Sequence, residues 1–237
     1  MPNDGGPIYL ETLMGRFPVE PWNTYSNLLF LALIVFWFLR VRRHAREHRF
    51  IACSLPVFLL GYVGGTVYHA TRSHEIWLIL DWGPIALLAL AVAMFFWRRQ
   101  GISWFVAPLI VIGPLALAGV AISLLGNSHT AIYLLPVVAL TILTPVFSYL
   151  VRTAWKDIGL VAGVLVGLAV AIGFRSIDYR VPIAFLPMGT HWLWHSFGAA
   201  TVHLLILYIY RGDLKEAARQ SVPCRPARHR DGLDPVQ

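Results

Sequence analysis

Apolar runs of about 20 residues recur along almost the whole chain, each long enough to cross the ~30 Å hydrocarbon core of a bilayer as a helix. Only 13% of the 237 residues are charged, about half the share in a soluble domain. Lipid offers no partners to bare backbone groups, so each run is expected to be helical. The sequence therefore predicts an all-α integral membrane protein, a seven transmembrane helix bundle with spans at 24–40, 52–71, 76–97, 103–125, 130–151, 157–174 and 189–210.

Lysine and arginine are distributed unevenly between the two ends of these spans. Fifteen of the 19 lie on one side, in loops and the C-terminal tail, and four lie on the other. Because basic loops stay in the cytoplasm, the N-terminus is predicted to be outside and the C-terminus cytoplasmic. The formal charge of +7 thus reflects orientation in the lipid bilayer, and no nucleic-acid partner is expected. Short loops without a cleaved signal favour a bacterial inner (plasma) membrane.

The chain is expected to divide after the seventh span. Residues 1–211 would form the membrane domain, and the basic, aromatic-poor residues 212–237 a disordered cytoplasmic tail. His44 and His48 lie among arginines of the first cytoplasmic loop and are expected to be solvated. A small-xxx-small series in the sixth span predicts close packing on a neighbouring helix, at Gly159, Gly163 and Gly167.

Ionisable side chains are rare within the predicted spans, and four of them lie at one level. His69 is near the outer end of the second span, and Asp81 is near the outer start of the third. His191 and His195 occupy the first two turns of the seventh span. At 1.5 Å per residue, all four lie within roughly 10 Å of the outer boundary. Ionisable groups in lipid are costly and usually functional, so the shared depth indicates one site. His203, deeper in the seventh span, is expected to make an interhelical hydrogen bond.

The i, i+4 spacing places His191 and His195 on one helical face, ~6 Å apart at Cβ. Such a pair can hold one metal ion, and His69 from a neighbouring helix would supply a third nitrogen. Three imidazoles plus water form the open tetrahedral site of zinc hydrolases. Asp81 would then be catalytic, holding the metal-bound water or moving protons. The alternative is that the histidines hydrogen-bond neighbouring helices or line a proton path.

Four short pieces of sequence resemble one known family. The segment 20–27 (EPWNTYSN) opens the first span with many polar groups, and by itself it is explained by a capped helix start with Asn23 or Thr24 as the cap. In order along the chain, it is followed by GGTVYH at 64–69, LD at 80–81 and GTHWLWH at 189–195. Together these pieces resemble the alkaline ceramidases, within a superfamily of seven-span hydrolases that includes adiponectin-type receptors and GPI-remodelling lipases.

The resemblance implies a zinc-dependent amidase that cuts the N-acyl bond of a ceramide-like membrane lipid, releasing a fatty acid and a sphingoid base. By the same resemblance, Asp81 assists the attacking water, and the zinc ligands are His69, His191 and His195. The family usually has a serine where Gly65 stands here. Some members also hold calcium near the N-terminus, and Glu11 and Glu20 would be two of its ligands, whereas Pro7 and Leu13 stand where further ligands are expected.

Two other functions stay open at this point. A receptor-like or signalling member of the same superfamily would hold zinc structurally, and the Asp81 and histidine pieces fit that branch too. A proton-coupled transporter would use the same residues as a relay. Transporters of that kind often contain paired broken helices in an internal repeat, and the sequence shows no repeat. The polar segment 20–27 favours the ceramidase-like hydrolase.

Overall fold

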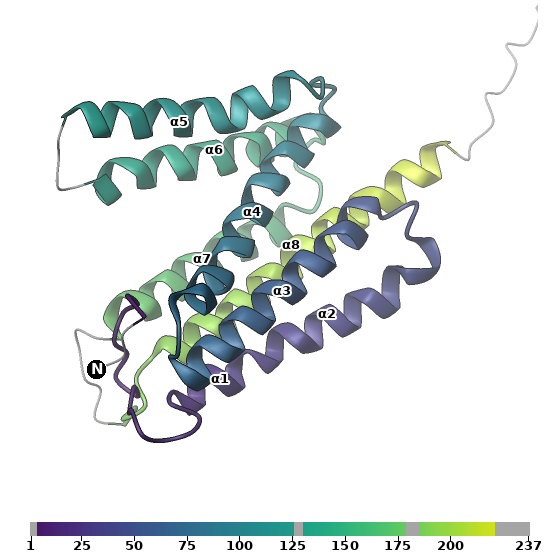
Figure 1. Ribbon diagram of the computed structural model, residues 1–237. Helices are drawn as coiled ribbons and strands as arrows, with labels where there is room; N and C mark the ends of the chain where they lie inside the picture. Colours follow the sequence, from purple (N-terminus) through teal and green to yellow (C-terminus); the bar gives the residue numbers. More distant parts are fainter. Residues whose placement is uncertain (1–3, 126–129, 179–184, 221–237) are drawn as a thin grey trace, which may run out of the picture.

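The computed structural model describes residues 4–125, 130–178 and 185–220, and every regular element within these ranges is a helix (Figure 1). The elements are α1 (Pro21–Ser26), α2 (Leu28–Val41), the 3-10 turn η1 (Arg42–His44), α3 (Arg49–Thr71), α4 (Glu75–Arg99), α5 (Val106–Leu125), α6 (Thr130–Arg152), α7 (Ile158–Ile177) and α8 (His191–Gln220). The all-α prediction is confirmed.

Six stretches among the described residues are long and apolar enough to cross a membrane. They are Pro21–His44, Arg49–Thr71, Glu75–Arg99, Val106–Leu124, Ile158–Ile177 and His191–Ala218. Between 11% and 28% of each apolar window is buried within the protein, so most of this apolar surface faces outward, as in helices that contact lipid. The predicted span at 130–151 coincides with α6, whose described apolar stretch, Val137–Arg152, is shorter. The structure therefore agrees with a multi-pass membrane protein.

The helices pack in two groups joined by α4. α7 packs mainly on α8, α4 mainly on α3, and α2 against both α3 and α8. α5 and α6 pack on each other and on α4, and Figure 1 shows this hairpin lying to one side of the other helices. Small residues permit the α7–α8 contact, because a Cβ at Gly163 would lie 2.9 Å from Leu204 and one at Gly167 would lie 2.5 Å from Thr201. The predicted packing role is confirmed for these two glycines, whereas Gly159 has no neighbour within 4 Å.

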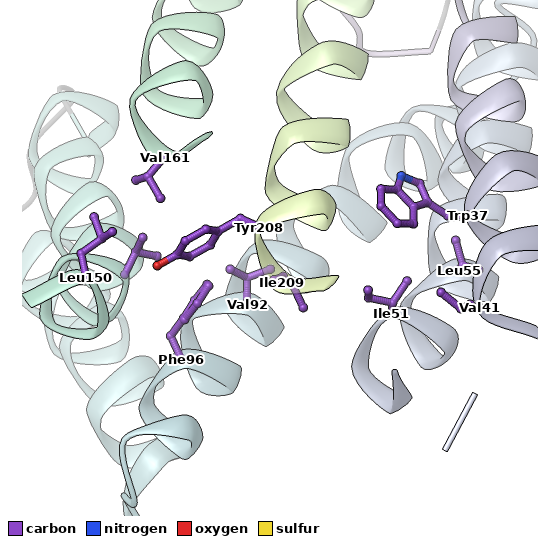
Figure 2. Packing of buried hydrophobic residues seen from close by; sticks show 11 residues of the cluster. Trp37, Val41, Ile51, Leu55, Val92, Phe96, Leu150, Val161, Tyr208 and Ile209 are labelled. Atoms are coloured by element: carbon purple, nitrogen blue, oxygen red, sulfur yellow. The ribbon is translucent and has the colours of Figure 1, made fainter. Parts of the chain in front are cut away.

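The buried apolar core lies in the half of the bundle where α2 ends and α3 begins (Figure 2). It joins Trp37 of α2 and Ile51 of α3 to residues near the ends of α4 and α8. In Figure 2 the ring of Tyr208, on α8, points toward Leu150 of α6. The candidate histidines lie in the other half of the bundle, at the end of α3 and the start of α8. Polar contacts hold that half together.

At the basic end the structure differs from the predictions for His48 and for the first residues of the tail. α8 continues to Gln220, so residues 212–220 are helical, and residues 221–237 lie outside the described residues. His48 is buried, with its Nδ1 2.9 Å from Asp213 Oδ2, and Arg99 donates to Oδ1 of the same carboxylate. These contacts tie the far part of α8 to the start of α3 and the end of α4, which explains why the helix does not stop where the apolar sequence does.

The first span begins earlier than predicted and is interrupted at Asn27, between α1 and α2. Neither Asn23 nor Thr24 is the N-cap, because both lie inside α1 and are buried. Instead, the carboxylate of Glu11 accepts the N–H groups of Trp22 and Asn23 at 2.8 and 2.6 Å. A side chain from the preceding segment thus satisfies the free donors of the helix start.

Candidate metal centre

Three histidines from two helices meet at the end of the bundle opposite the apolar core. His69 lies in the last turn of α3, and His191 and His195 lie in the first two turns of α8. One ring nitrogen of each lies within 4.8 Å of the others. The three residues are 0%, 1% and 3% exposed, and their ring centres are 4.8 to 5.3 Å apart. The structure therefore brings together the three histidines that the sequence singled out.

Hydrogen bonds orient two of these rings. His69 Nδ1 lies 2.6 Å from Glu20 Oε2. His195 Nδ1 lies 3.1 Å from the backbone carbonyl of Asn23 and 2.7 Å from Ser26 Oγ. Because an ionised carboxylate and a carbonyl only accept, Nδ1 carries the hydrogen in both rings. Each Nε2 then keeps a free lone pair, which is how imidazole binds a metal when its other nitrogen is held by a carboxylate or carbonyl.

The buried nitrogens of the cluster fit a cation. His69 Nε2 and His191 Nδ1 have no hydrogen-bond partner among the described residues. Such atoms are rare in proteins, and each costs about 1–3 kcal/mol when nothing satisfies it. A metal ion between the rings would satisfy both, and imidazole nitrogen suits zinc and several other transition metals. Within the described part of the chain, these histidines form the one group of three or more potential ligands.

Asp178, directly after α7, holds the start of the helix that carries two of the histidines. Its carboxylate accepts the N–H groups of Thr190 and His191, the latter at 2.8 Å, and also the N–H of Leu10 at 3.2 Å. Gly189 is required here, because its φ is +78° and a Cβ would collide with Asp178. One carboxylate thus joins α7, α8 and the N-terminal segment.

The N-terminal segment covers the histidines. Tyr9 stacks on His191, with ring centres 3.9 Å apart and planes inclined by 28°. Burial raises the pKa of the Tyr9 hydroxyl, so the ring stays neutral beside the site. The segment is fastened at both sides of this contact, by Leu10 to Asp178 and by Asp4 to Arg72.

Arg72 is a buried arginine directly behind His69. It is 2% exposed, and its guanidinium donates to Asp4 at 2.6 and 2.9 Å and to Glu20 Oε1 at 2.5 Å. Burial alone would raise the pKa of Glu20, but hydrogen bonds from His69, Thr12 and Arg72 outweigh burial and place the pKa below its usual value. Glu20 is therefore ionised, and it connects the guanidinium to the imidazole.

The two carboxylates of the predicted calcium site have protein partners. Glu20 is shared by Arg72 and His69, and Glu11 accepts the backbone N–H groups at the start of α1. Burial raises the pKa of Glu11 above its usual value, although those N–H groups counteract it. Neither carboxylate belongs to the group of potential metal ligands found among the described residues. Calcium binding stays a prediction.

Asp81, on α4, lies beside Gly65 on α3. A Cβ on Gly65 would collide with Asp81 Oδ1 and would lie 3.4 Å from Asn27 Oδ1. The carboxylate therefore takes the space that a side chain at position 65 would need, which accounts for a glycine at this position. No hydrogen bond from the described part of the chain reaches the Asp81 carboxylate.

A cavity of about 310 Å³ begins beside this carboxylate and His195 and lies between the α3–α4 pair and the α7–α8 pair. Its lining extends from Asp81 to Leu88 on α4 and from His195 to Val202 on α8. Each of these pairs is seven positions apart, which is about 10 Å along a helix. Most of its other lining is apolar, including Phe30, Phe58, Ile85 and Leu168. The cavity thus runs from polar groups at the histidine end toward the middle of the helices.

Arg175, near the end of α7, also lines this cavity. Its guanidinium lies 5.2 Å from the centre of the Trp194 ring, a separation typical of a cation–π contact. His203 lies outside the histidine cluster, and its predicted interhelical hydrogen bond is wrong. Its ring contacts Phe36 and Trp37 at 5.8 and 5.6 Å between ring centres, and its Nδ1 has no partner among the described residues.

Sequence reasoning missed the residues that support the histidines. In the sequence, Arg72 is only one of the four basic residues on the less basic side, and Asp4 and Asp178 belong to no motif. The available signal was an arginine three residues after His69, at the end of a helix, with several acidic residues upstream. A single arginine near a membrane boundary is usually solvated, so this signal indicates an ion-pair network only once the N-terminal segment is known to fold over the site.

A scan of the chain against protein-family models finds no match, and neither does a search of curated proteins. The resemblance to the alkaline ceramidases therefore depends on the four sequence pieces alone. All four border the same site: 20–27 holds two of the histidine rings, 64–69 and 189–195 carry the histidines, and 80–81 carries Asp81.

Proposed function

We propose that this protein is a zinc-dependent membrane hydrolase that cuts the amide bond of a ceramide-like lipid. The observation that carries the proposal is the meeting of three groups in one place. Buried imidazoles with free nitrogens converge on one point. The Asp81 carboxylate, which no described residue hydrogen-bonds, lines a cavity together with His195, and most of that cavity is apolar. A metal site alone would not need the other two.

Amide hydrolysis requires an activated water and a proton for the leaving amine. When bound, zinc would lower the pKa of a coordinated water and polarise the amide carbonyl. Asp81 would accept a proton from the attacking water and return it to the amine nitrogen as the C–N bond breaks. Glu20 would hold the His69 ring in one tautomer throughout, because its carboxylate accepts from His69 Nδ1 at 2.6 Å.

The cavity suits the hydrocarbon part of such a substrate. Its polar groups would meet the amide and headgroup, and its apolar length along α4 and α8 would cover the start of an acyl chain. Because α4 packs on α3 and α7 packs on α8, the side between α4 and α7 is where a lipid would enter from the bilayer. Arg175 and Trp194, at the polar end, would contact the headgroup.

We further propose a bundle of seven spans, with α6 as the fifth, the N-terminus outside and the C-terminus in the cytoplasm. Fifteen of the 19 lysines and arginines support this orientation. The site would then lie at the non-cytoplasmic face of a bacterial inner membrane.

One alternative has an observation in its favour. The histidine rings are held on several sides by Glu20, Ser26 and Tyr9, and such rigidity would also suit a structural metal in a receptor-like protein. In that case the metal would bind without turnover.

The test compares metal content and turnover in three detergent-purified proteins. His195→Ala removes a ligand, and His203→Ala removes a half-buried histidine of the same helix that lies outside the cluster. We expect about one zinc per chain in the parent and in His203→Ala, and a large loss in His195→Ala, because a three-histidine site loses a ligand. Fatty-acid release from a ceramide should follow the zinc content. Equal zinc in all three, or none in any, would refute the metal site, whereas zinc without release would favour the receptor-like alternative.

A further inference from the structure

A second cavity, of about 440 Å³, lies at the opposite end of the molecule. The end of α4, the turn from α6 to α7, and the late part of α8 form its walls. α6 packs on α4 and α5, while α7 packs on α8. The cavity therefore occupies the place where the α5–α6 hairpin meets the rest of the bundle.

Basic side chains predominate in this cavity. Four cationic and two acidic side chains line it, namely Arg99, Arg152, Lys156, Lys215, Asp157 and Glu216. Just outside the lining, Asp213 contacts Arg99 and Arg211 contacts Asp157, so these two neighbours offset each other. The cavity carries an excess of two positive charges.

The two excess positive charges belong to Arg152 and Lys156. Lys215 pairs with Asp157, and Arg99 pairs with acidic residues of α8. Within the described ranges, Arg152 donates only to the backbone carbonyl of Gln100, at 2.6 Å. The Lys156 ammonium has no hydrogen bond or ion pair with the described residues. Two cations at the α6–α7 turn are thus without a negative partner among the residues that the structure describes.

One buried donor in the wall is also without a partner. Arg99 Nη1 is buried and makes no hydrogen bond to the described residues. It lies against Gly212, where a Cβ would collide with it, and near the Tyr149 hydroxyl, which would be 3.6 Å from that Cβ. An unsatisfied buried donor on a charged group is costly, and an anion in the cavity would satisfy it.

We propose that this cavity binds the phosphate group of an anionic phospholipid. Arginine matches phosphate oxygens with paired donors, and basic pockets between helices on the cytoplasmic side of membrane proteins bind such headgroups. Exposed apolar side chains adjoin the cavity at the same turn, including Trp155 and Ile158, which are each 46% exposed. These residues offer a surface to acyl chains, which a free phosphate ion would not use. The bound lipid joins the α5–α6 hairpin to α7 and α8.

The experiment measures lipid binding to the full-length, detergent-purified protein by thermal unfolding and native mass spectrometry. The probes are dioleoyl phosphatidylglycerol, dioleoyl phosphatidylcholine and inorganic phosphate. The test variant, Arg152→Gln with Lys156→Gln, removes the two unpaired cations. The control, Arg42→Gln with Arg43→Gln, removes two exposed cations from η1 at the same end of the molecule.

We expect phosphatidylglycerol to bind the parent and to raise its melting temperature more than phosphatidylcholine does. The test variant should bind phosphatidylglycerol roughly thirtyfold more weakly, since each cation near a lipid headgroup contributes about fivefold, and the control should change by less than about threefold. Lys156→Glu, a single change at an exposed side chain, should also weaken phosphatidylglycerol binding. It replaces the double variant as the test if the double variant does not fold. Zinc content should be the same in all variants, which separates this test from that of the hydrolase.

Two results would overturn the proposal. Equal affinity of the parent and both test variants for phosphatidylglycerol would mean that the cavity cations do not bind the lipid. Stabilisation of the parent by millimolar inorganic phosphate to the same extent as by phosphatidylglycerol would overturn the assignment to a lipid.

Discussion

Glu20→Gln tests whether the carboxylate behind His69 determines metal affinity. Glu20 accepts hydrogen bonds on both oxygens, Oε1 from Arg72 and Thr12 and Oε2 from His69 and Asn23. Glutamine has one accepting oxygen and one NH₂ group. Whichever way the amide turns, its NH₂ group faces either the guanidinium or the His69 Nδ1–H, and one of these donors loses its acceptor.

The expected size of the effect follows from these contacts. Loss of a carboxylate that holds a metal-binding histidine typically lowers metal affinity about 10–100-fold, which is about 1.4–2.7 kcal/mol. The apo protein should also lose stability, because the Glu20 and Arg72 side chains are both 0% exposed. Breaking a buried ion pair costs about 3–5 kcal/mol. The loss here should lie at or below the lower limit, since Arg72 keeps Asp4 as a partner.

Glu11→Gln is the matched control. Glu11 belongs to the same segment and is 8% exposed, but its carboxylate accepts backbone N–H groups and does not contact a histidine. Zinc affinity would be measured by competition with a fluorescent chelator after metal removal. We expect Glu11→Gln to stay within about threefold of the parent, because a residue tunes a metal through a hydrogen bond to one of its ligands, and Glu11 makes none to a histidine. Equal zinc affinity of Glu20→Gln and the parent, or an equal loss in both variants, would refute the reasoning.

Three further predictions concern the same structure. Asp81→Asn should keep its zinc but lose roughly 10²–10⁴-fold in lipid hydrolysis, because a proton-transfer group is removed; turnover like the parent's would exclude that role. Gly64→Ala should destabilise the protein by about 1–3 kcal/mol, because the new Cβ would lie 2.5 Å from Leu80. In Gly159→Ala the new Cβ has no atom within 4 Å, so the protein should instead become more stable by up to ~1 kcal/mol from helix propensity. Melting temperatures of the two glycine variants that shift in the same direction would contradict this. Burial raises the pKa of Asp4, but the hydrogen bonds from Arg72 and from the Gly6 N–H, together with the charge of Arg72, outweigh burial and hold the pKa below its usual value. Since the folded-state pKa is the lower one, the stability from this ion pair is complete above the unfolded value and is lost as pH falls through the folded value. The melting temperature of the parent should therefore fall more steeply than that of Asp4→Asn between about pH 4 and pH 2, and parallel curves would exclude an ion-pair contribution.

The fold class was predictable because the membrane imposes it. Apolar runs of membrane-spanning length can only be helices in lipid, so the ranges around 52–71, 76–97 and 189–210 correspond to α3, α4 and α8. Helix ends were less predictable. The far part of α8 is stabilised by ion pairs with α3 and α4, and hydropathy does not register such contacts.

Part of the candidate site was predictable, because the depth of a residue in the membrane can be counted from the sequence even when the distances between side chains are unknown. Residues that lie at the same depth in the membrane can be neighbours when their helices pack together, whereas residues at different depths cannot. For this reason His69 and the pair on α8 could be assigned to one cluster. The supporting residues have no such constraint. Asp4, Arg72 and Asp178 lie outside the apolar stretches, where a charged side chain costs little in water and its sequence position does not indicate a partner.

The sequence by itself therefore determined that the chain is helical, that it suits a membrane, and which histidines share a level. Only the tertiary structure decided that Glu20 turns toward His69, that Asp81 takes the space left by Gly65, and that an apolar cavity begins beside them. The physical reason is the range of the interactions. Hydrophobic periodicity and membrane thickness act on each segment separately, whereas hydrogen bonds and cavities depend on atoms that only folding brings together from distant parts of the chain.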